Sequence, residues 1–204
     1  MLLQEYYNKT VQENEDGKRW AGLYYGVLTK VINDNGFKNV AEVGIGYGTH
    51  AKYLLKSTKL EKLYLIDPMK YYPNDLFAST IMEMTPRIPG NNFNEMHELI
   101  NNYLSPYNSK YTWLRKESLA VENHEIPDES LDCVFVDGDH SYQAVIADLE
   151  FWYKKVRVGG QLLGDDYSMR DVAAAVRDFT MQNNLKYDLL YKPGTSYPIF
   201  RLIK

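Results

Sequence analysis

Cysteine, long apolar runs and a signal-peptide pattern are scarce in or absent from this sequence, and each of these observations excludes some classes of protein. It has a single cysteine, Cys133, which cannot form an internal disulfide, so a reducing cytoplasm is the expected location. It has no apolar run near the roughly 18–20 residues that cross a bilayer. Residues 1–8 lack the basic flank and the apolar stretch of a signal peptide. We therefore expect no membrane partner.

Basic charge is also scarce. The 23 lysines and arginines are outnumbered by 27 aspartates and glutamates, which leaves a formal net charge of −4. Binding to nucleic-acid phosphates needs clustered lysine and arginine, so no nucleic-acid partner is expected. With 204 residues, of which 45% are hydrophobic and 25% charged, the chain has the composition of one globular domain that spans residues 1–204.

Hydrophobic periodicity predicts strands that alternate with helices. The expected helices span residues 18–35, 51–55, 94–104, 142–153 and 171–183. The expected strands span residues 40–43, 63–66, 111–114, 131–136, 161–163, 187–191 and 198–203, and the last two form a hairpin. This order is typical of an α/β fold with a doubly wound, Rossmann-like, mostly parallel sheet of about seven strands and an antiparallel C-terminal hairpin. Residues 69–110 interrupt the pattern, and we expect this inserted region to form part of a substrate pocket.

The most informative stretch is a glycine-rich turn after the first predicted strand. Gly44, Gly46 and Gly48 occupy every second position shortly after Glu42. Glycine tolerates a positive φ and has no Cβ, so the main chain of such a turn can approach a cofactor closely. The next segment has helical spacing, and the amides at its N-terminus face the turn. His50 opens that helix and is therefore a candidate for contact with a cofactor.

In a doubly wound sheet, ligands bind beyond the carboxyl ends of the strands, so the polar residues that follow each strand are site candidates. Asp67 lies about 20 residues beyond the glycine turn, where an acid binds the ribose hydroxyls of an adenosine-containing cofactor. The alternative is that Asp67 caps the turn at Pro68. Ser118 follows the third strand and either contacts the adenine or makes a local turn bond.

Three aspartates follow the fourth and fifth predicted strands. If these strands are neighbours, Asp137, Asp165 and Asp166 converge, and clustered carboxylates repel one another unless a cation lies between them. Oxygen ligands of this kind suit Mg²⁺. The alternative is that the aspartates cap loops and accept from backbone amides. His140 is either a general base or a cap on the helix that starts at Ser141.

From about Val40 onward, the chain resembles a class I S-adenosylmethionine-dependent methyltransferase. Residues 42–48, Glu-Val-Gly-Ile-Gly-Tyr-Gly, fit that family's first motif, an acid followed by alternating glycines. A dinucleotide fingerprint fits less well, because Thr49 stands where its last glycine belongs. Similarity to small-molecule O-methyltransferases of the Methyltransf_24 type rests on residues 131–142, Asp148-Leu149, Gly159-Gly160, residues 164–167 and residues 172–179.

The resemblance implies S-adenosylmethionine as the cofactor and a role for each candidate residue. The residues expected to bind the cofactor are Glu42, Gly44, Gly46 and Gly48 on the methionine side, Asp67 at the ribose, Ser118 at the adenine, and also His50 and Asp137. The metal ligands of cation-dependent relatives match Asp137, Asp165 and Asp166. His140 stands where catechol-type enzymes carry a catalytic lysine, and His140 and Asp137 are the expected catalytic residues.

The predicted function is O-methylation of a hydroxyl on a small-molecule substrate, with Mg²⁺ as an optional second cofactor. In this scheme Mg²⁺ on the aspartates orients the hydroxyl and lowers its pKa, and His140 accepts the proton. Two alternatives stay open. One is a catalytically silent protein that binds S-adenosylmethionine as a scaffold. The other is an NAD-dependent oxidoreductase, which shares the glycine turn and the acid at position 67. A homodimer is also left open.

Overall fold

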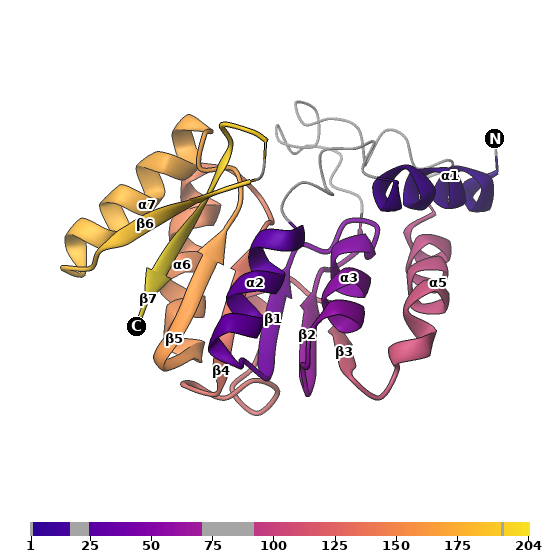
Figure 1. The fold of residues 1–204 in the computed structure, drawn as a ribbon, viewed down its shortest axis with the longest axis horizontal. Coiled ribbons are helices and arrows are strands. Elements are labelled where there is room, and N and C mark those ends of the chain that lie inside the picture. The colour runs from indigo at the N-terminus through magenta and orange to yellow at the C-terminus, as the bar shows by residue number, and fades with distance from the viewer. Residues whose placement is uncertain (1, 17–24, 71–91, 193) are drawn as a thin grey trace.

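A seven-stranded sheet forms the centre of the molecule (Figure 1) in a computed structural model that describes residues 2–16, 25–70, 92–192 and 194–204. Its strands are β1 (Asn39–Val43), β2 (Lys62–Ile66), β3 (Tyr111–Leu114), β4 (Leu131–Val136), β5 (Val156–Gly164), β6 (Tyr187–Tyr191) and β7 (Pro198–Ile203). Their spatial order is β3-β2-β1-β4-β5-β7-β6, and β7 runs antiparallel to both of its neighbours. The predicted fold class is therefore confirmed.

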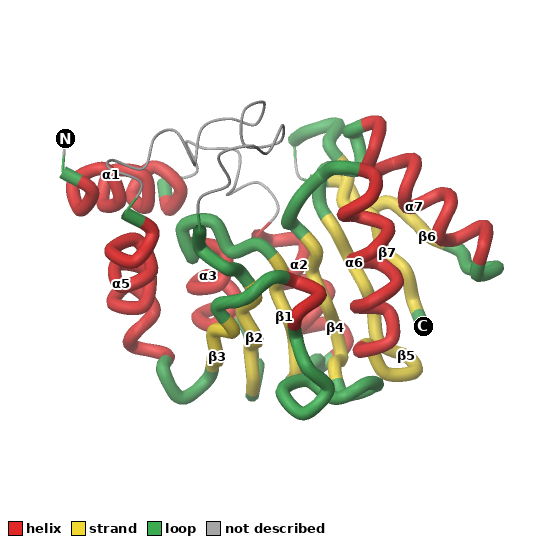
Figure 2. Tube along the Cα trace, turned by 180° about the vertical axis from the view of Figure 1, so that it is seen from behind, coloured by secondary structure: helices red, strands yellow, loops and turns green. Residues whose placement is uncertain are grey.

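Helices cover both faces of the sheet, as the parallel strands require. The α-helices of the described residues are α1 (Leu3–Glu15), α2 (Tyr25–Asn35), α3 (Thr49–Ser57), α5 (Phe93–Leu104), α6 (Tyr142–Lys155) and α7 (Arg170–Gln182). Figure 1 shows α2 and α3 in front of the sheet, and Figure 2 shows α6 and α7 on the opposite face. Among these helices, none has both the length and the apolar character that spanning a bilayer would need.

Each central strand is buried on both faces, because successive side chains of a strand point to opposite sides. On β4, Cys133 and Phe135 pack into the cluster on the side of α2 and α3, whereas Val134 and Val136 pack into the cluster on the side of α6 and α7. The side chain of Cys133 is fully buried and is part of the core.

Two sequence expectations fall partly outside the described residues. The helix expected over residues 18–35 is described only from α2 onward, since residues 17–24 lie outside the described ranges. Half of the inserted region at 69–110, residues 71–91, lies outside them as well. Its described part contains α5, which agrees with the helix expected over residues 94–104.

The fifth strand is longer than predicted. The sequence predicted a strand only over residues 161–163, but β5 begins at Val156 and continues through Gly159 and Gly160. The two glycines, which are typical of a turn, mark a distortion of this strand, because Gly159 has a positive φ of 76° and the pairing register between β4 and β5 shifts there. A Cβ on Gly160 would lie 2.7 Å from the carbonyl oxygen of Asp132, so this glycine lets the two strands approach.

Helix α1 was not expected from the sequence. Its buried residues are Leu3, Tyr7, Thr10, Val11 and Asn14, which recur at helical spacing but include two polar side chains. The apolar stripe is therefore weak, so the sequence pattern does not indicate an amphipathic helix in this segment. In the structure α1 packs on the glycine turn: the Tyr7 hydroxyl donates to the backbone oxygen of Tyr47 at 3.1 Å, and the hydroxyls of Tyr6 and Tyr47 lie 2.9 Å apart.

Candidate active site

The glycine turn after β1 presses against the loop after β4. Gly44 has a φ of 80°, and a Cβ at this position would lie 2.0 Å from the backbone oxygen of Asp137. The amide of Asp137 in turn donates to the backbone oxygen of Val43 at 2.8 Å. Gly48, with a φ of 75°, precedes the first residue of α3, and a Cβ there would lie 2.8 Å from the side chain of Ile100. Only glycine fits at these two positions without displacing a neighbour.

Asp67, directly after β2, stabilises the same turn through hydrogen bonds. One carboxylate oxygen accepts from the amide of Ile45 at 3.1 Å, and the other accepts from the amide of Met69 at 2.7 Å. Burial raises the pKa of the Asp67 carboxyl, and these two amides counteract part of that increase. The cap on the Pro68 turn, one of the two roles considered for Asp67, is thus present. The contact with ribose stays a prediction.

Glu42 and His50 form a buried pair beneath the glycine turn. Their side chains are 2% and 3% exposed, and the Glu42 Oε1 to His50 Nδ1 distance is 3.0 Å. The His50 ring stacks on Tyr25 and lies edge-on to Phe135. Within the described part of the chain, Glu42 Oε2 has no hydrogen-bond partner although it is buried. This pairing could not be predicted from the sequence, because the local pattern identifies the strand and the helix but not which of their side chains meet.

Ser118 belongs to a buried hydrogen-bond network that the sequence did not reveal. Its hydroxyl donates to the carboxylate of Asp148 and accepts from the indole nitrogen of Trp152 at 2.7 Å. Both partners lie on α6, so the network fixes the loop after β3 to that helix. A contact of Ser118 with adenine stays a prediction, and the hydroxyl already has two partners.

The Asp148 carboxylate gives this network a pH dependence. Burial raises its pKa from 3.8 to about 6, so the folded protein binds the proton more tightly than the unfolded chain does. The stabilisation is fully present below the unfolded pKa of 3.8 and is lost as the pH rises through about 6. The difference corresponds to a loss of about 3 kcal/mol in the free energy of unfolding.

We therefore expect Asp148→Asn, which mimics the protonated side chain, to remove this loss. The variant should match the parent protein near pH 4 and should exceed its free energy of unfolding by up to about 3 kcal/mol at pH 7. Urea unfolding across this pH range measures the difference between the two proteins. Parallel curves for the variant and the parent would contradict the assignment of the raised pKa to Asp148.

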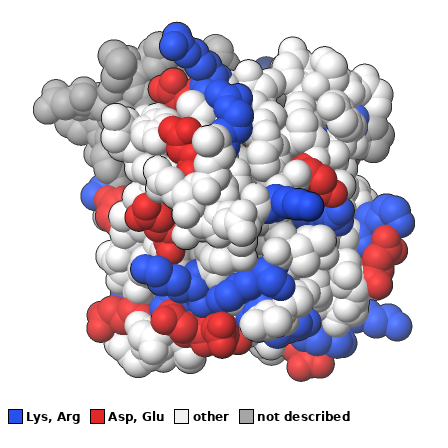
Figure 3. All heavy atoms as spheres, turned by 90° about the vertical axis from the view of Figure 1, so that its left-hand side faces the viewer, with Lys and Arg blue, Asp and Glu red and all other residues white. Residues whose placement is uncertain are grey.

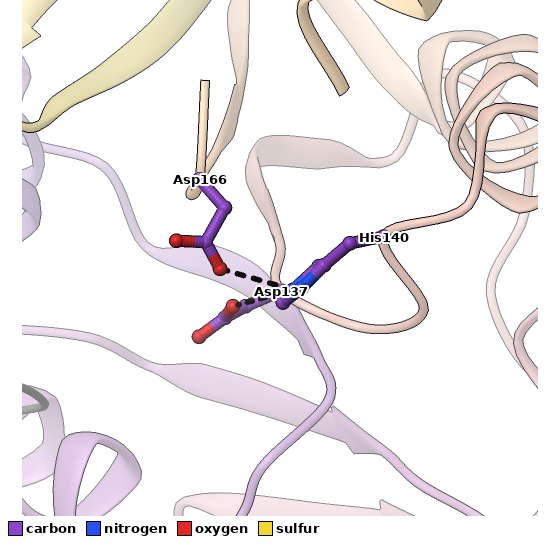
Figure 4. Close-up of side chains that lie close together, drawn as sticks. All are labelled: Asp137, His140 and Asp166. Carbon is purple, nitrogen blue, oxygen red and sulfur yellow. Dashed lines mark ion pairs between the residues drawn. The ribbon is translucent and has the colours of Figure 1, made fainter. Parts of the chain in front are cut away.

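A cluster of two carboxylates and an imidazole lies where β4 and β5 end. His140 Nε2 is 3.1 Å from Asp166 Oδ2 and 3.6 Å from Asp137 Oδ1 (Figure 4). The three side chains are partly exposed, at 13% for His140, 21% for Asp137 and 34% for Asp166. We call these three residues the acid–imidazole cluster. Because Gly44 abuts the backbone of Asp137, the cluster lies directly beside the glycine turn.

The local backbone explains how these side chains meet. Asp139 accepts from the amide of Ser141 at 2.7 Å, and Ser141 is the residue that caps α6. His140 is therefore not the helix cap, which was one of the two roles considered for it. Asp166 has a positive φ of 54°, a conformation that costs a non-glycine residue about 1 kcal/mol. That conformation sets the direction in which the Asp166 carboxylate leaves the chain toward His140.

Opposing influences act on the protonation of the cluster. Burial alone would lower the pKa of His140, but its contact with Asp137 and the charges of Asp166 and Asp165 raise it above its usual value. Burial raises the pKa of Asp166, and the charge of His140 counteracts part of that increase. The two carboxylates thus favour the charged imidazolium, which makes His140 a stronger proton acceptor than a solvated histidine.

Asp165 does not join the acid–imidazole cluster. Of the three aspartates predicted to bind a metal, the structure brings Asp137 and Asp166 together with His140 but directs Asp165 to Lys192. Asp165 Oδ1 lies 2.6 Å from Lys192 Nζ, and both side chains are less than 10% exposed. The sequence could not reveal this pair, because Lys192 lies in a hairpin turn, far along the chain from Asp165.

Comparisons with known proteins agree with this geometry. The profile of a methyltransferase-domain family, Methyltransf_24, matches residues 41–167, which include the glycine turn and the acid–imidazole cluster. The chain belongs to this family. It carries a class I S-adenosylmethionine-dependent methyltransferase domain.

Other relatives of this methyltransferase are distant. The uncharacterized protein R132 of Acanthamoeba polyphaga mimivirus is 25% identical over 161 residues, and the match spans 78% of this chain but only 65% of that protein. An O-methyltransferase from Bacillus cereus in complex with SAH aligns with a TM-score of 0.63 at 14% identity, over 97% of this chain and 90% of that one. The tRNA (m1A58) methyltransferase TrmI from Aquifex aeolicus aligns with a TM-score of 0.56 at 13% identity, over 89% and 67% of the two chains. Such similarities establish the fold and leave the acceptor open.

Proposed function

We propose that this methyltransferase transfers the methyl group of S-adenosylmethionine to a hydroxyl of a small molecule. One observation carries the proposal: the glycine turn and the acid–imidazole cluster share a backbone contact at Gly44 and Asp137. A turn that lets a cofactor approach bare backbone is therefore adjacent to a group that accepts protons. Methyl transfer to a hydroxyl needs both features next to each other.

The residues around the turn fit S-adenosylmethionine. Gly44 and Gly48 leave backbone uncovered at the end of β1, where the fold places its ligands. Glu42 Oε2 is a buried acceptor that has no hydrogen-bond partner among the described residues, which suits a positively charged donor. When bound, the cofactor supplies a methyl group that its sulfonium already activates, so the protein mainly has to align the acceptor.

In the proposed reaction the imidazole of His140 accepts the proton of the acceptor hydroxyl. Asp137 and Asp166 face His140 Nε2 and stabilise the imidazolium that forms. The three side chains are partly exposed, so an acceptor hydroxyl can reach the cluster. Basic and acidic side chains lie beside one another on the face shown in Figure 3, and the overall charge is negative. Both observations favour a small molecule over a nucleic acid.

Support for Mg²⁺ is weaker than the sequence suggested. Mg²⁺ prefers oxygen ligands in an octahedral arrangement, whereas the described cluster offers two carboxylates and an imidazole nitrogen. The third predicted ligand, Asp165, is engaged with an ammonium group. These residues do not fit the ion well, so the proposed reaction has no step that uses Mg²⁺.

Two measurements test the proposed function. Calorimetric titration with S-adenosylmethionine, with NAD as the control, is expected to show micromolar binding of S-adenosylmethionine alone. Formation of S-adenosylhomocysteine is then measured with catechols, phenols and sugars as acceptors, and at least one of these classes is expected to support turnover. Tight binding without turnover on any acceptor would favour the silent scaffold protein, and binding of NAD instead would favour the oxidoreductase.

A further inference from the structure

A buried lysine from a distant part of the chain pairs with Asp165, next to the acid–imidazole cluster. Lys192 follows β6, and its side chain is 9% exposed. Its ammonium lies 2.6 Å from Asp165 Oδ1, at the carboxyl end of β5. Burying an ammonium is costly unless an opposite charge compensates it. The buried ammonium of Lys192 is therefore stabilised by the carboxylate of Asp165 at this corner of the sheet.

The hairpin turn fixes the backbone of Lys192. The amide of Thr195 and the hydroxyl of Thr195 both donate to the carbonyl oxygen of Lys192, at 3.1 Å and 3.2 Å. The amide of Lys192 donates to the carbonyl oxygen of Tyr197 at 3.5 Å. Strand β7 then pairs with β5 through Gly164, directly before Asp165. The hairpin that adds β7 and β6 to the sheet therefore also places Lys192 next to the site.

Lys192 acts on the cluster through a chain of contacts. Its ammonium holds one carboxylate oxygen of Asp165, and that same oxygen accepts from the amide of Asp166 at 2.7 Å. Asp166 in turn faces His140. The lysine therefore fixes the segment that presents Asp166 to the imidazole, and its positive charge lowers the electrostatic repulsion among the aspartates.

We propose that Lys192 is the resident cation of the acceptor site and positions Asp165 and Asp166 in place of a divalent metal ion. The proposal rests on the proposed function insofar as this corner binds the acceptor hydroxyl. Three carboxylates face two nitrogen-borne positive charges, from Lys192 and from His140 when it is protonated. An additional divalent cation would have to enter beside an ammonium, which repels it. The protein therefore does not need a divalent cation at this corner and binds one only weakly.

Binding of Mn²⁺ alone tests the proposal without any methyl transfer. Mn²⁺ takes the same oxygen ligands as Mg²⁺, and its binding is measured by water proton relaxation and electron paramagnetic resonance. We expect the parent protein and Lys192→Arg to bind Mn²⁺ only at millimolar concentration. Lys192→Met, which leaves the carboxylates without that charge, is expected to bind at least about tenfold more tightly. Lys186→Met, at an exposed lysine just before β6, is the control and should behave like the parent.

Turnover gives a second and separate readout. Chelation with EDTA should leave the rate of the parent protein unchanged. Lys192→Met should lose about tenfold or more in kcat, recover part of it on addition of Mn²⁺, and keep its affinity for S-adenosylmethionine. Thermal unfolding and circular dichroism establish that the variant is folded before either measurement.

The two proposals fail in different ways. Micromolar Mn²⁺ binding by the parent protein that is lost in Asp137→Asn would overturn the role of Lys192, as would equal Mn²⁺ affinities of the parent and Lys192→Met. Absence of turnover on every acceptor would count against the proposed function, and the Mn²⁺ titrations would still decide the role of the lysine.

Discussion

Gly44→Ala is expected to abolish measurable binding of S-adenosylmethionine and to lower the stability of the fold. The new Cβ would lie 2.0 Å from the carbonyl oxygen of Asp137, so the turn after β1 and the loop after β4 must separate. Overpacking and the positive φ together cost about 3 kcal/mol. For a protein of this length, that loss corresponds to a fall of roughly 6–12 °C in the unfolding temperature.

The control for this prediction separates the close contact from the backbone conformation. Gly36 also has a positive φ, of 64°, but no atom of the described residues lies within 4 Å of the position that its Cβ would take. Gly36→Ala should therefore cost only about 1 kcal/mol and should bind the cofactor normally. Calorimetric titration and thermal unfolding of both variants test this. If Gly44→Ala bound S-adenosylmethionine as tightly as Gly36→Ala, the glycine turn would not be the cofactor site.

His140→Gln is expected to lower kcat by about 10²–10⁴-fold, the range that a general base contributes. Glutamine keeps a polar side chain beside Asp137 and Asp166 but cannot accept a proton near neutral pH. Affinity for S-adenosylmethionine should change by no more than about threefold, because the glycine turn and the Glu42–His50 pair are untouched. The measurement is the rate of S-adenosylhomocysteine formation on an acceptor that the parent protein methylates.

A second histidine provides the matched control for the base. His124 has a side chain that is 75% exposed and pairs only with the nearby Glu122 among the contacts described here. His124→Gln should therefore retain the rate of the parent protein. If His140→Gln also retained that rate, proton transfer would have to use another group, and the assignment of His140 as the base would be wrong.

The sheet was predictable from the sequence because its signals are local. The central strands β1 and β4 have apolar runs whose side chains are buried alternately on the two faces, so the runs alone identify them. The extent of β5 was not predictable, because a bulge at Gly159 and a turn share the same glycine signal. Helix α1 escaped detection because Thr10 and Asn14 interrupt its buried stripe.

The site was predictable only where a residue follows a strand directly. Asp137, Asp166 and His140 converge because β4 and β5 are neighbours, which the order of elements suggested. Contacts between residues that are far apart in the chain could not be predicted from the local sequence pattern. Lys192 looks like an ordinary turn residue, and Asp148 looks like an exposed position of a helix until the loop that carries Ser118 packs on it.

The order of the last strands has a consequence for how the protein reaches its active state. β6 precedes β7 in the chain, yet β7 lies between β5 and β6 in the sheet. β6 therefore joins the sheet only through β7, and Lys192 lies in the turn between these two strands. Without the hairpin in place, the aspartates after β5 would face one another without their lysine, and their mutual repulsion would oppose closure of this corner. The hairpin that completes the sheet thus also supplies the positive charge that neutralises the site.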